Sequence, residues 1–184
     1  MATLSPYSQH VVFRHGRSLL IRAIRPDDKQ RLLDGFHRLT GESVYYRFFG
    51  GKQNLSEKEL RYFTEIDFEH HVAIVATIMS EDKEEIIAVG RYIETRSKGP
   101  ERAAELAFTV ADEYQNLGIG TLLFNQVLAV AQNNGISQLE ADVLLENKAM
   151  LVIFKHCGFK LKTTKKNSMV HIEFIVTAQQ HGKI

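Results

Sequence analysis

Glu105-Leu-Ala-Phe-Thr-Val110, Ala111-Asp-Glu-Tyr114 and Gln115-Asn-Leu-Gly118-Ile-Gly120-Thr121 follow one another and predict a strand, a polar loop and the start of a helix. Gly118 and Gly120 allow the backbone to approach a ligand where a Cβ atom would collide with it. The first amides of a helix have no partner inside the helix, and the helix dipole places partial positive charge there. We therefore expect a phosphate group, here a pyrophosphate, to bind at this turn. The residues expected to surround it are Gln115, Asn116, Leu117, Gly118, Ile119, Gly120 and Thr121.

Two better-known glycine loops do not match this turn. A dinucleotide-binding fingerprint requires a third glycine, and Leu123 occupies that position. A P-loop requires Gly-Lys-Ser or Gly-Lys-Thr, and neither follows the glycines. The sequence therefore excludes both loops as explanations of the turn.

Length and composition are those of one globular domain. With 184 residues, of which 44% are hydrophobic and 24% charged, the chain is long enough for a sizeable core. We expect a lead-in over residues 1–17, a single domain over residues 18–178 and a tail over residues 179–184. The 23 basic and 22 acidic side chains leave a net charge of +1, which does not suggest a nucleic-acid partner.

The sequence shows no signal for a membrane or an oxidising compartment. Cys157 is the only cysteine, so no internal disulfide can form. Residues 1–16 lack the apolar core of a secretory signal. Residues 115–139 contain no charged side chain, but amides and Gly135 interrupt the apolar run that a membrane span requires. We therefore expect a cytoplasmic protein without a membrane partner.

Hydrophobic periodicity and turn residues predict a mixed sheet with helices on its faces. The apolar segments over residues 72–78 and 86–94 are expected to be antiparallel neighbours. Residues 139–146 alternate with a period of two and follow a helix, so they should form a strand parallel to the Glu105 strand. The other expected elements are a strand over 18–24, a helix over 26–39 ended by Gly41, two short helices within 43–51 and after Ser56, a linker over 95–101, a helix over 119–135, a helix over 147–156 and a last strand over 170–177.

Gln115, Gly118 and Gly120 match the pattern Gln/Arg-x-x-Gly-x-Gly/Ala, which resembles the acyl-CoA-binding motif of the GNAT superfamily of N-acetyltransferases. The surroundings agree, because a strand with a glutamate precedes the motif and a closing helix with a Gly-Phe ending follows it. The resemblance implies an α/β (α+β) GNAT fold, with a mixed, mostly antiparallel central sheet of six to seven strands and helices on both faces. It also implies acetyl-CoA as cosubstrate, a primary amine as acceptor and no metal.

Three further segments are most similar to the acetyltransferase domains of bacterial protein-lysine acetyltransferases: Ile24 to Asp28, Tyr46 to Gly50 and Phe63 to Asp67. This similarity implies that the acceptor is a lysine ε-amine on a protein, with a small-molecule amine as the alternative. Such domains often adjoin regulatory or ligase domains. We expect no room for one within these 184 residues, so inherited regulation stays an open question. The oligomeric state stays open, and a homodimer is one of the options.

Glu105 is the candidate general base. Acylation of an amine requires the neutral form, whereas an ammonium with a pKa of about 10.4 stays protonated at neutral pH. In an apolar strand, desolvation would raise the pKa of Glu105, which could take the proton directly or through a water. The matching glutamate is the general base in the family that the chain resembles. The alternative is a rim carboxylate that pairs with Arg91 or Arg102.

Four other positions have roles implied by the resemblance. Phe108 and Val110 would donate backbone N–H groups to the acetyl and pantetheine groups, while their side chains belong to the core. Asn147 would donate to the pantetheine arm, and a plain helix cap is the alternative or an additional role. Many relatives have a tyrosine that protonates the leaving thiolate where this chain has Phe154. A thiol with a pKa of about 8.5 is an acceptable leaving group without it.

Other reactive side chains do not form a recognisable site. His156 and Cys157 are adjacent on a predicted helix and point in different directions, which argues against a nucleophile pair. The pair His70-His71 lacks the spacing of metal ligands. Tyr46 and Arg47 lie in an aromatic cluster that packing explains, unless they border the acceptor cleft.

Three functional classes are compatible with these observations. They are an acetyl-CoA-dependent N-acetyltransferase, a non-catalytic acyl-CoA-binding sensor, and an unrelated mixed-sheet protein whose glycines only form a turn. Glu105 favours the enzyme over the sensor, whereas the missing tyrosine keeps the sensor open. We expect the enzyme.

Overall fold

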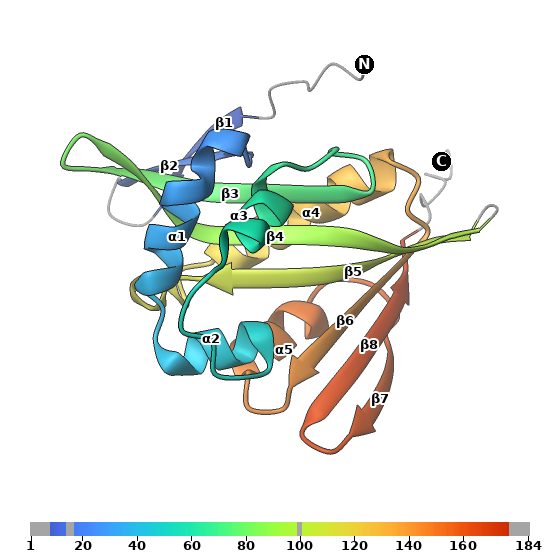
Figure 1. Ribbon diagram of the computed structural model, residues 1–184. Coiled ribbons are helices and arrows are strands. Elements are labelled where there is room, and N and C mark those ends of the chain that lie inside the picture. Colours follow the sequence, from blue (N-terminus) through green and yellow to red (C-terminus); the bar gives the residue numbers. More distant parts are fainter. Residues whose placement is uncertain (1–7, 14–16, 99–100, 177–184) are drawn as a thin grey trace.

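The structure is a computed structural model that describes residues 8–13, 17–98 and 101–176. These residues contain one eight-stranded sheet in the order β1-β2-β3-β4-β5-β6-β8-β7 (Figure 1). Neighbouring strands are antiparallel except β5 and β6, which are parallel, so the predicted mixed, mostly antiparallel sheet is confirmed. The strands are β1 (Ser8–Phe13), β2 (Arg17–Ala23), β3 (His71–Ser80), β4 (Lys83–Lys98), β5 (Glu101–Val110), β6 (Gln138–Leu144), β7 (Lys162–Lys166) and β8 (Met169–Ile175).

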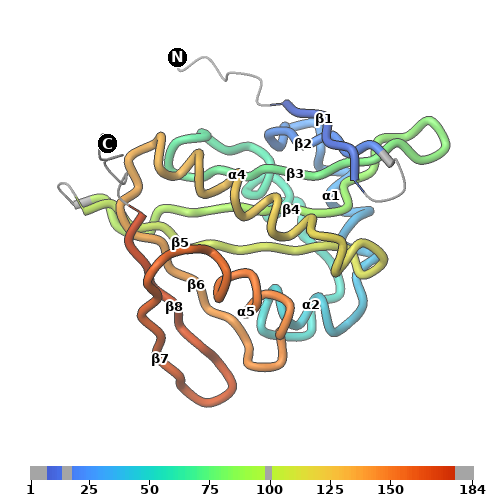
Figure 2. The backbone as a smooth tube through the Cα atoms, turned by 180° about the vertical axis from the view of Figure 1, so that it is seen from behind, coloured from blue at the N-terminus to red at the C-terminus, as the bar shows by residue number. Residues whose placement is uncertain are grey.

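Helices cover both faces of this sheet, as Figures 1 and 2 show from opposite sides. One face carries α1 (Lys29–His37), α2 (Gly41–Phe48) and α3 (Glu57–Thr64), and the other carries α4 (Ile119–Asn133) and α5 (Lys148–Lys155). Two short 3-10 helices, η2 (Pro26–Asp28) and η3 (Asp112–Tyr114), precede α1 and follow β5. None of the helices in the described part of the chain combines the length and apolar composition that a membrane span needs.

The central strand β3 contributes to two hydrophobic cores, because successive side chains of a strand point to opposite faces. Val72, Ile74 and Ala76 are fully buried in the core under α4. Ala73 and Val75 are fully buried in the second core, under α1 to α3. This double burial explains why β3 is a continuous apolar run rather than an alternating one.

The sheet has eight strands where six to seven were expected, and the two additional strands lie at its edges. β1 lies within residues 1–17, which were expected to be a lead-in, and its side chains are exposed or half-buried. All five side chains of β7 are exposed and none is apolar, so no hydrophobic alternation marks that strand. Edge strands of this kind lack the pattern on which the prediction depends.

Several predicted boundaries were wrong. Gly41 does not end the preceding helix but begins α2, because the Thr40 side chain accepts a hydrogen bond from the Ser43 N–H and caps the new helix. The expected helix over residues 26–39 is η2 followed by α1. Most of the expected linker over residues 95–101 is strand, since β4 continues to Lys98. Gly99 and Pro100, which were expected to form the turn, lie outside the described residues.

The segment Ile24 to Asp28 has a structural role. Asp28 is fully buried and accepts two hydrogen bonds from the Arg22 guanidinium, at 2.7 and 2.8 Å. It also accepts the Arg25 N–H at 2.8 Å, which fixes the start of η2. Burial of Asp28 opposes ionisation, but the hydrogen bonds from Arg22 outweigh it and lower the pKa of Asp28 below its ordinary value.

The divergence of β5 and β6 positions the candidate site. The two strands pair only through residues 103–105 and 138–140, at the N-terminal half of β5. Beyond Glu105 they separate, as Figure 1 shows, so the C-terminal half of β5 has one edge without a strand partner. Unpaired amides at such an edge are available to a ligand.

Candidate active site

A cleft of about 650 Å³ lies where β5, the turn before α4, α2 and α5 meet. Eight of the ten residues predicted to bind the cosubstrate line this cleft: Phe108, Val110, Gln115, Asn116, Gly118, Gly120, Thr121 and Asn147. Leu117 and Ile119 do not line it, because their side chains pack into the core under α4. For these two residues only the backbone is left to contact a ligand.

The turn from Asn116 to Thr121 presents a row of unpaired backbone amides. Asn116 and Gly118 have positive φ values, 59° and 86°, which turn the chain into the first residue of α4. In the described part of the chain, no acceptor receives a hydrogen bond from the N–H groups of residues 116–121. The next amide, of Leu122, donates to the Gly118 carbonyl at 3.0 Å. Free amides at a helix N-terminus suit an anion, so the pyrophosphate at this turn stays a prediction that the geometry allows.

The Gln115 side chain fixes this turn to its neighbours. Its Nε2 donates to the Val110 carbonyl and to the Ser43 Oγ, both at 3.1 Å. Ser43 in turn donates to Asp112 at 2.8 Å, and Thr40 donates to the same carboxylate through its N–H and its hydroxyl. Burial of Asp112 opposes ionisation, but these hydrogen bonds outweigh it and lower its pKa. This connection between α2 and the turn was missed by sequence reasoning.

The free edge of β5 carries the amides predicted to contact the acetyl-CoA arm. The Ala111 N–H donates to the Ile87 carbonyl of β4 at 2.8 Å. Because successive amides of a strand alternate between its two edges, those of Phe108 and Val110 face away from β4. The Val110 carbonyl agrees with this direction, since it accepts from the Gln115 side chain at the cleft. Both amides therefore point to the side where β6 has diverged.

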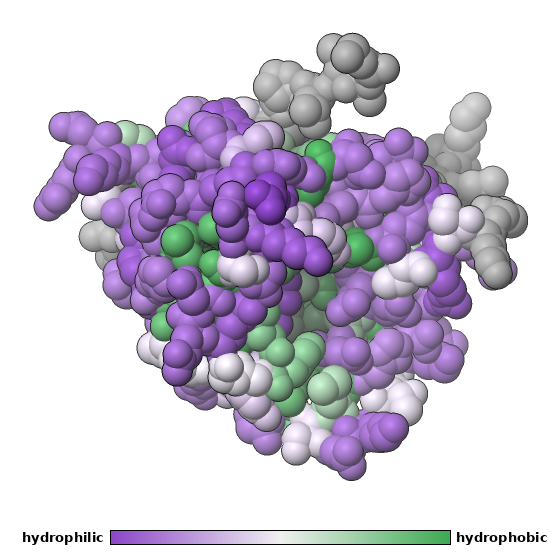
Figure 3. Space-filling model, in the orientation of Figure 1, coloured by the Kyte–Doolittle hydropathy of each residue, from purple (hydrophilic) through white to green (hydrophobic). Residues whose placement is uncertain are grey.

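Glu105 lies in a second cavity, of about 40 Å³, which adjoins the cleft. Partial burial raises the pKa of Glu105 above its ordinary value, the Asp142 carboxylate adds to this effect, and the Arg47 guanidinium opposes it. Five residues line both spaces: Tyr46, Arg47, Phe108, Asn147 and Met150. Figure 3 shows apolar surface at the lower edge of this face, around α2 and the end of β6.

Neither arginine expected to pair with Glu105 does so. Arg102 forms its ion pair with Glu94, at 2.7 Å. Arg91 contacts the His71 Nε2 at 3.1 Å and has no carboxylate within 4.0 Å among the described residues. In the same residues no hydrogen bond or ion pair occupies the Glu105 carboxylate, so it is free to accept a proton from a ligand.

α5 closes the other side of the cleft. The Asn147 Oδ1 accepts the Met150 N–H at 3.1 Å, so the predicted helix cap is confirmed, while the Asn147 amide nitrogen is available to the cleft. Phe154 is 1% exposed and packs its ring against Phe124 and Phe174. It lines the Glu105 cavity without a hydroxyl group, so this position offers no proton to a leaving group.

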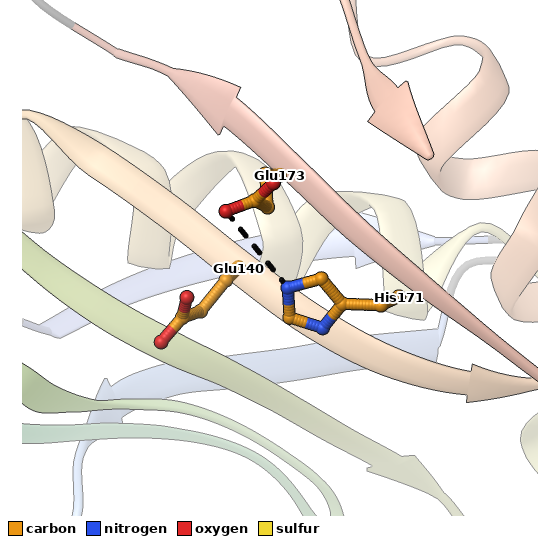
Figure 4. Close-up of side chains that lie close together, drawn as sticks. All are labelled: Glu140, His171 and Glu173. Carbon is orange, nitrogen blue, oxygen red and sulfur yellow. Dashed lines mark ion pairs between the residues drawn. The ribbon is translucent and has the colours of Figure 1, made fainter. Parts of the chain in front are cut away.

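A polar cluster lies on β6 and β8 near Glu105 (Figure 4). Its members, Glu140, His171 and Glu173, each have a potential ligand atom within 4.8 Å of the others. The His171 Nδ1 lies 2.8 Å from Asp142, and the Lys162 Nζ lies 2.8 Å from Glu173. Thr95 donates to Glu140 at 2.8 Å. Because each member already has a polar partner, the cluster is explained as a network on the sheet surface.

Comparisons with known proteins agree with this geometry. The model of the acetyltransferase (GNAT) family matches residues 42–159. An acetyltransferase of Pseudomonas aeruginosa is 30% identical over 144 residues, covering 78% of this chain and 76% of the relative. Acetyltransferase Pat of Mycolicibacterium smegmatis is 32% identical over 148 residues, covering 80% of this chain and 43% of the relative. The GNAT domain of S. lividans PAT has a TM-score of 0.82 at 35% identity, with 91% of this chain and 96% of that domain covered.

The chain therefore belongs to the acetyltransferase (GNAT) family. It is an acetyl-CoA-dependent acetyltransferase with an amine acceptor. The cleft fits this cosubstrate, because unpaired amides at a helix start suit the pyrophosphate and the free edge of β5 suits an extended, hydrogen-bonding arm. A Cβ atom at Gly120 would come within 2.9 Å of the Ile153 side chain, so the glycine keeps the cleft open.

Proposed function

We propose that this enzyme transfers the acetyl group of acetyl-CoA to a lysine ε-amine of a protein, with Glu105 as general base. The observation that carries the proposal is the position of Glu105, without an ion-pair partner among the described residues, in a cavity that adjoins the cleft. A sensor that only binds acetyl-CoA has no need of a free carboxylate with a raised pKa at this place.

The proposed roles of the cleft residues follow from their geometry. The amides of Asn116 to Thr121 bind the pyrophosphate, and the Gln115 side chain holds that turn in place. The amides of Phe108 and Val110 bind the acetyl and pantetheine groups. The Asn147 amide donates to the pantetheine arm while its oxygen caps α5.

We assign the removal of the proton from the acceptor ammonium to Glu105. The acceptor enters as an ammonium, and its nitrogen needs a free electron pair to attack the thioester carbonyl. The Glu105 carboxylate accepts the proton directly or through a water, and its raised pKa makes it a stronger base than an ordinary glutamate. Because the carboxylate is the active form, the rate should rise with pH through this raised pKa.

The choice of a protein lysine rests on resemblance. The chain is similar to the GNAT domain of S. lividans PAT over 91% of its length. Of the three segments shared with protein-lysine acetyltransferases, Ile24 to Asp28 has a structural role through Asp28. Phe63 to Asp67 ends α3, and Asp67 accepts the amides of residues 69–71. Tyr46 to Gly50 is the segment that borders the site, so it carries the connection to the acceptor.

Glu105→Gln tests the base. The variant should keep its fold and its CoA affinity by calorimetry but lose roughly 100-fold or more in turnover at neutral pH. The loss should shrink at high pH, where more of the amine is already neutral. Glu101→Gln, on the same strand with the same change of charge, is the matched control and should behave as wild type. Rates of Glu105→Gln equal to wild type below pH 8 would remove Glu105 from the mechanism.

A second measurement tests the acceptor. The enzyme is incubated with acetyl-CoA and cell extract, and acetyl-lysines are mapped by mass spectrometry against a Glu105→Gln control. Enzyme-dependent acetylation of defined lysines is expected. Rapid transfer to a polyamine, amino acid or aminoglycoside without any enzyme-dependent protein acetylation would assign the enzyme to small-molecule amines instead.

A further inference from the structure

Two arginines near the site, Arg47 and Arg91, have no carboxylate within 4.0 Å of their guanidinium groups among the described residues. Arg91 is 4% exposed and lies over the Phe63 ring at 4.5 Å, with His71 as its polar contact. Arg47 is half-buried and lines the cleft, the Glu105 cavity and an apolar cavity of about 60 Å³ under α1. Of these two arginines, Arg47 is therefore the one that faces both the cleft and the Glu105 cavity.

Other arginines with similar burial are paired. Arg22, at 1% exposure, holds Asp28 and Glu84 at 2.7 and 2.8 Å. Arg102 holds Glu94 at 2.7 Å. Burying a guanidinium without a counter-ion is costly, and desolvation lowers the pKa of Arg47, which the Glu105 carboxylate only partly offsets. A partly buried guanidinium without a counter-ion is suited to stabilise an anion that forms beside it during a reaction.

The transfer reaction creates such an anion. The ammonium first gives one proton to Glu105, which passes it to solvent. The neutral amine then attacks the thioester carbonyl, a C–N bond forms, and the Glu105 carboxylate takes the second proton that the nitrogen loses. The C–S bond breaks, and its electron pair leaves with sulfur as the CoA thiolate, which later takes a proton from solvent. Negative charge thus disappears from the Glu105 carboxylate and appears on sulfur within one reaction. Arg47 lines both the Glu105 cavity and the cleft, so its positive charge can act on both spaces for the whole transfer.

Apart from Glu105, which serves as the base, the residues that line the Glu105 cavity offer no good proton donor to the thiolate. Phe154 has no hydroxyl group. The Tyr46 phenol already donates to Glu42 at 2.5 Å, and this hydrogen bond raises the pKa of Tyr46 to about 12. Since a thiol is a stronger acid than a phenol with this pKa, proton transfer from Tyr46 to the thiolate would be unfavourable. A nearby cation can stabilise the thiolate without donating a proton.

We propose that Arg47 is a further catalytic residue, whose guanidinium stabilises the departing CoA thiolate in place of the tyrosine acid that this chain lacks. This inference rests on the proposed function for the transfer step, but its first test does not need transfer. The alternative, an anionic group of the acceptor bound by Arg47, is separated from it by the second test.

The first test measures the pKa of the CoA thiol in its complex with the enzyme, from the ultraviolet absorbance of the thiolate. The complex with desulfo-CoA is the blank, which removes the signal of Cys157. In wild type the bound thiol should titrate at a lower pH than free CoA titrated in the same way, and Arg47→Gln should return its pKa to that of free CoA. Arg47→Lys, which keeps the charge, should keep most of the shift. An ordinary thiol pKa in the wild-type complex, or equal values in wild type and Arg47→Gln, would overturn the proposal.

The second test compares turnover with three acceptors: a lysine peptide with acidic residues, a C-terminally amidated lysine peptide without them, and a simple alkylamine. Arg47→Gln should lower kcat roughly 100-fold for all three, with little change in acetyl-CoA affinity, as for loss of one preorganised electrostatic group. Arg61→Gln is the matched control, because Arg61 is exposed on α3 and pairs with Glu57 at 2.9 Å. A loss confined to acceptors that carry an anionic group would overturn the proposal and assign Arg47 to acceptor binding.

Discussion

Gly120→Glu is expected to weaken CoA binding strongly by adding a carboxylate inside the proposed pyrophosphate site. Gly120 lines the cleft at the start of α4, within the row of unpaired amides. Its missing Cβ would point toward α5, 2.9 Å from the Ile153 Cδ1 and 3.7 Å from the Val110 Cγ2. A longer side chain at this position must therefore extend into the space that the cosubstrate needs.

The magnitude follows from electrostatics. Two unit charges at 4 Å repel by about 1 kcal/mol in water and about 4 kcal/mol at an effective dielectric constant of 20. A partly open cleft and two phosphate charges give a repulsion of about 3 kcal/mol, which corresponds to roughly 100-fold weaker binding. A higher salt concentration should reduce this electrostatic repulsion, because the Debye length falls from about 10 Å at 0.1 M to about 3 Å at 1 M.

Calorimetry with CoA at two salt concentrations is the assay. Gly120→Gln has the size of the glutamate without its charge, so the difference between the two variants isolates repulsion from steric exclusion. Gly120→Ala adds the Cβ alone, and Ile153→Val in the same chain removes the methyl group that this Cβ would meet. CoA affinity equal to wild type in a folded Gly120→Glu protein would refute the placement of the pyrophosphate.

Two further predictions concern the stability of the parts that hold the site. Gly118→Ala should lower the free energy of unfolding by about 1–2 kcal/mol in urea titrations, because Gly118 has φ 86° and L-residues are strained there; Gly118→Asn should cost less, and equal stability of all three proteins would contradict the strain. Asp28→Asn should cost about 1.5–3 kcal/mol, because Arg22 would remain buried with Glu84 as its remaining carboxylate partner. Since the pKa of Asp28 is lowered in the folded state, its contribution is fully present above the unfolded pKa of about 3.9 and is lost as pH falls through the folded value, so Asp28→Asn should flatten the acid side of the stability profile.

The parts of the fold that the sequence predicted are those with local signals. The Ser56 capping box is present, with the Ser56 and Glu59 side chains each accepting the other residue's N–H. Antiparallel β3 and β4 and the parallel pair β5 and β6 follow from apolar runs and from the intervening helix. In each case the local sequence signal and the contacts of the whole fold favour the same structure.

The parts that were missed depend on contacts between distant residues. Gln115 and Asp112 hold α2 through Ser43, over separations of 72 and 69 residues, and no pattern near either end announces this contact. The absence of an ion pair at Arg47 is also a property of the assembled structure, since it requires that acidic side chains from every neighbouring element stay away. The sequence motifs predicted most of the residues that line the cleft, but they did not predict which charged side chains near it lack a partner.

Strand β5 carries both the proposed base, Glu105, and the amide proposed to bind the acetyl group, that of Phe108, and the distance between them bears on the mechanism. Glu105 and Phe108 are three residues apart, which is about 10 Å along a strand. Their directions differ, because the Glu105 side chain leaves the face of the sheet that carries α2 whereas the Phe108 amide lies in the plane of the sheet and faces its free edge. The proposed base and the proposed acetyl site are therefore separated by a gap, which the acceptor nitrogen alone or with one water would fill. An acetyl group at the Phe108 amide and a base at Glu105 therefore leave room for the amine between them, on the side where Arg47 lies.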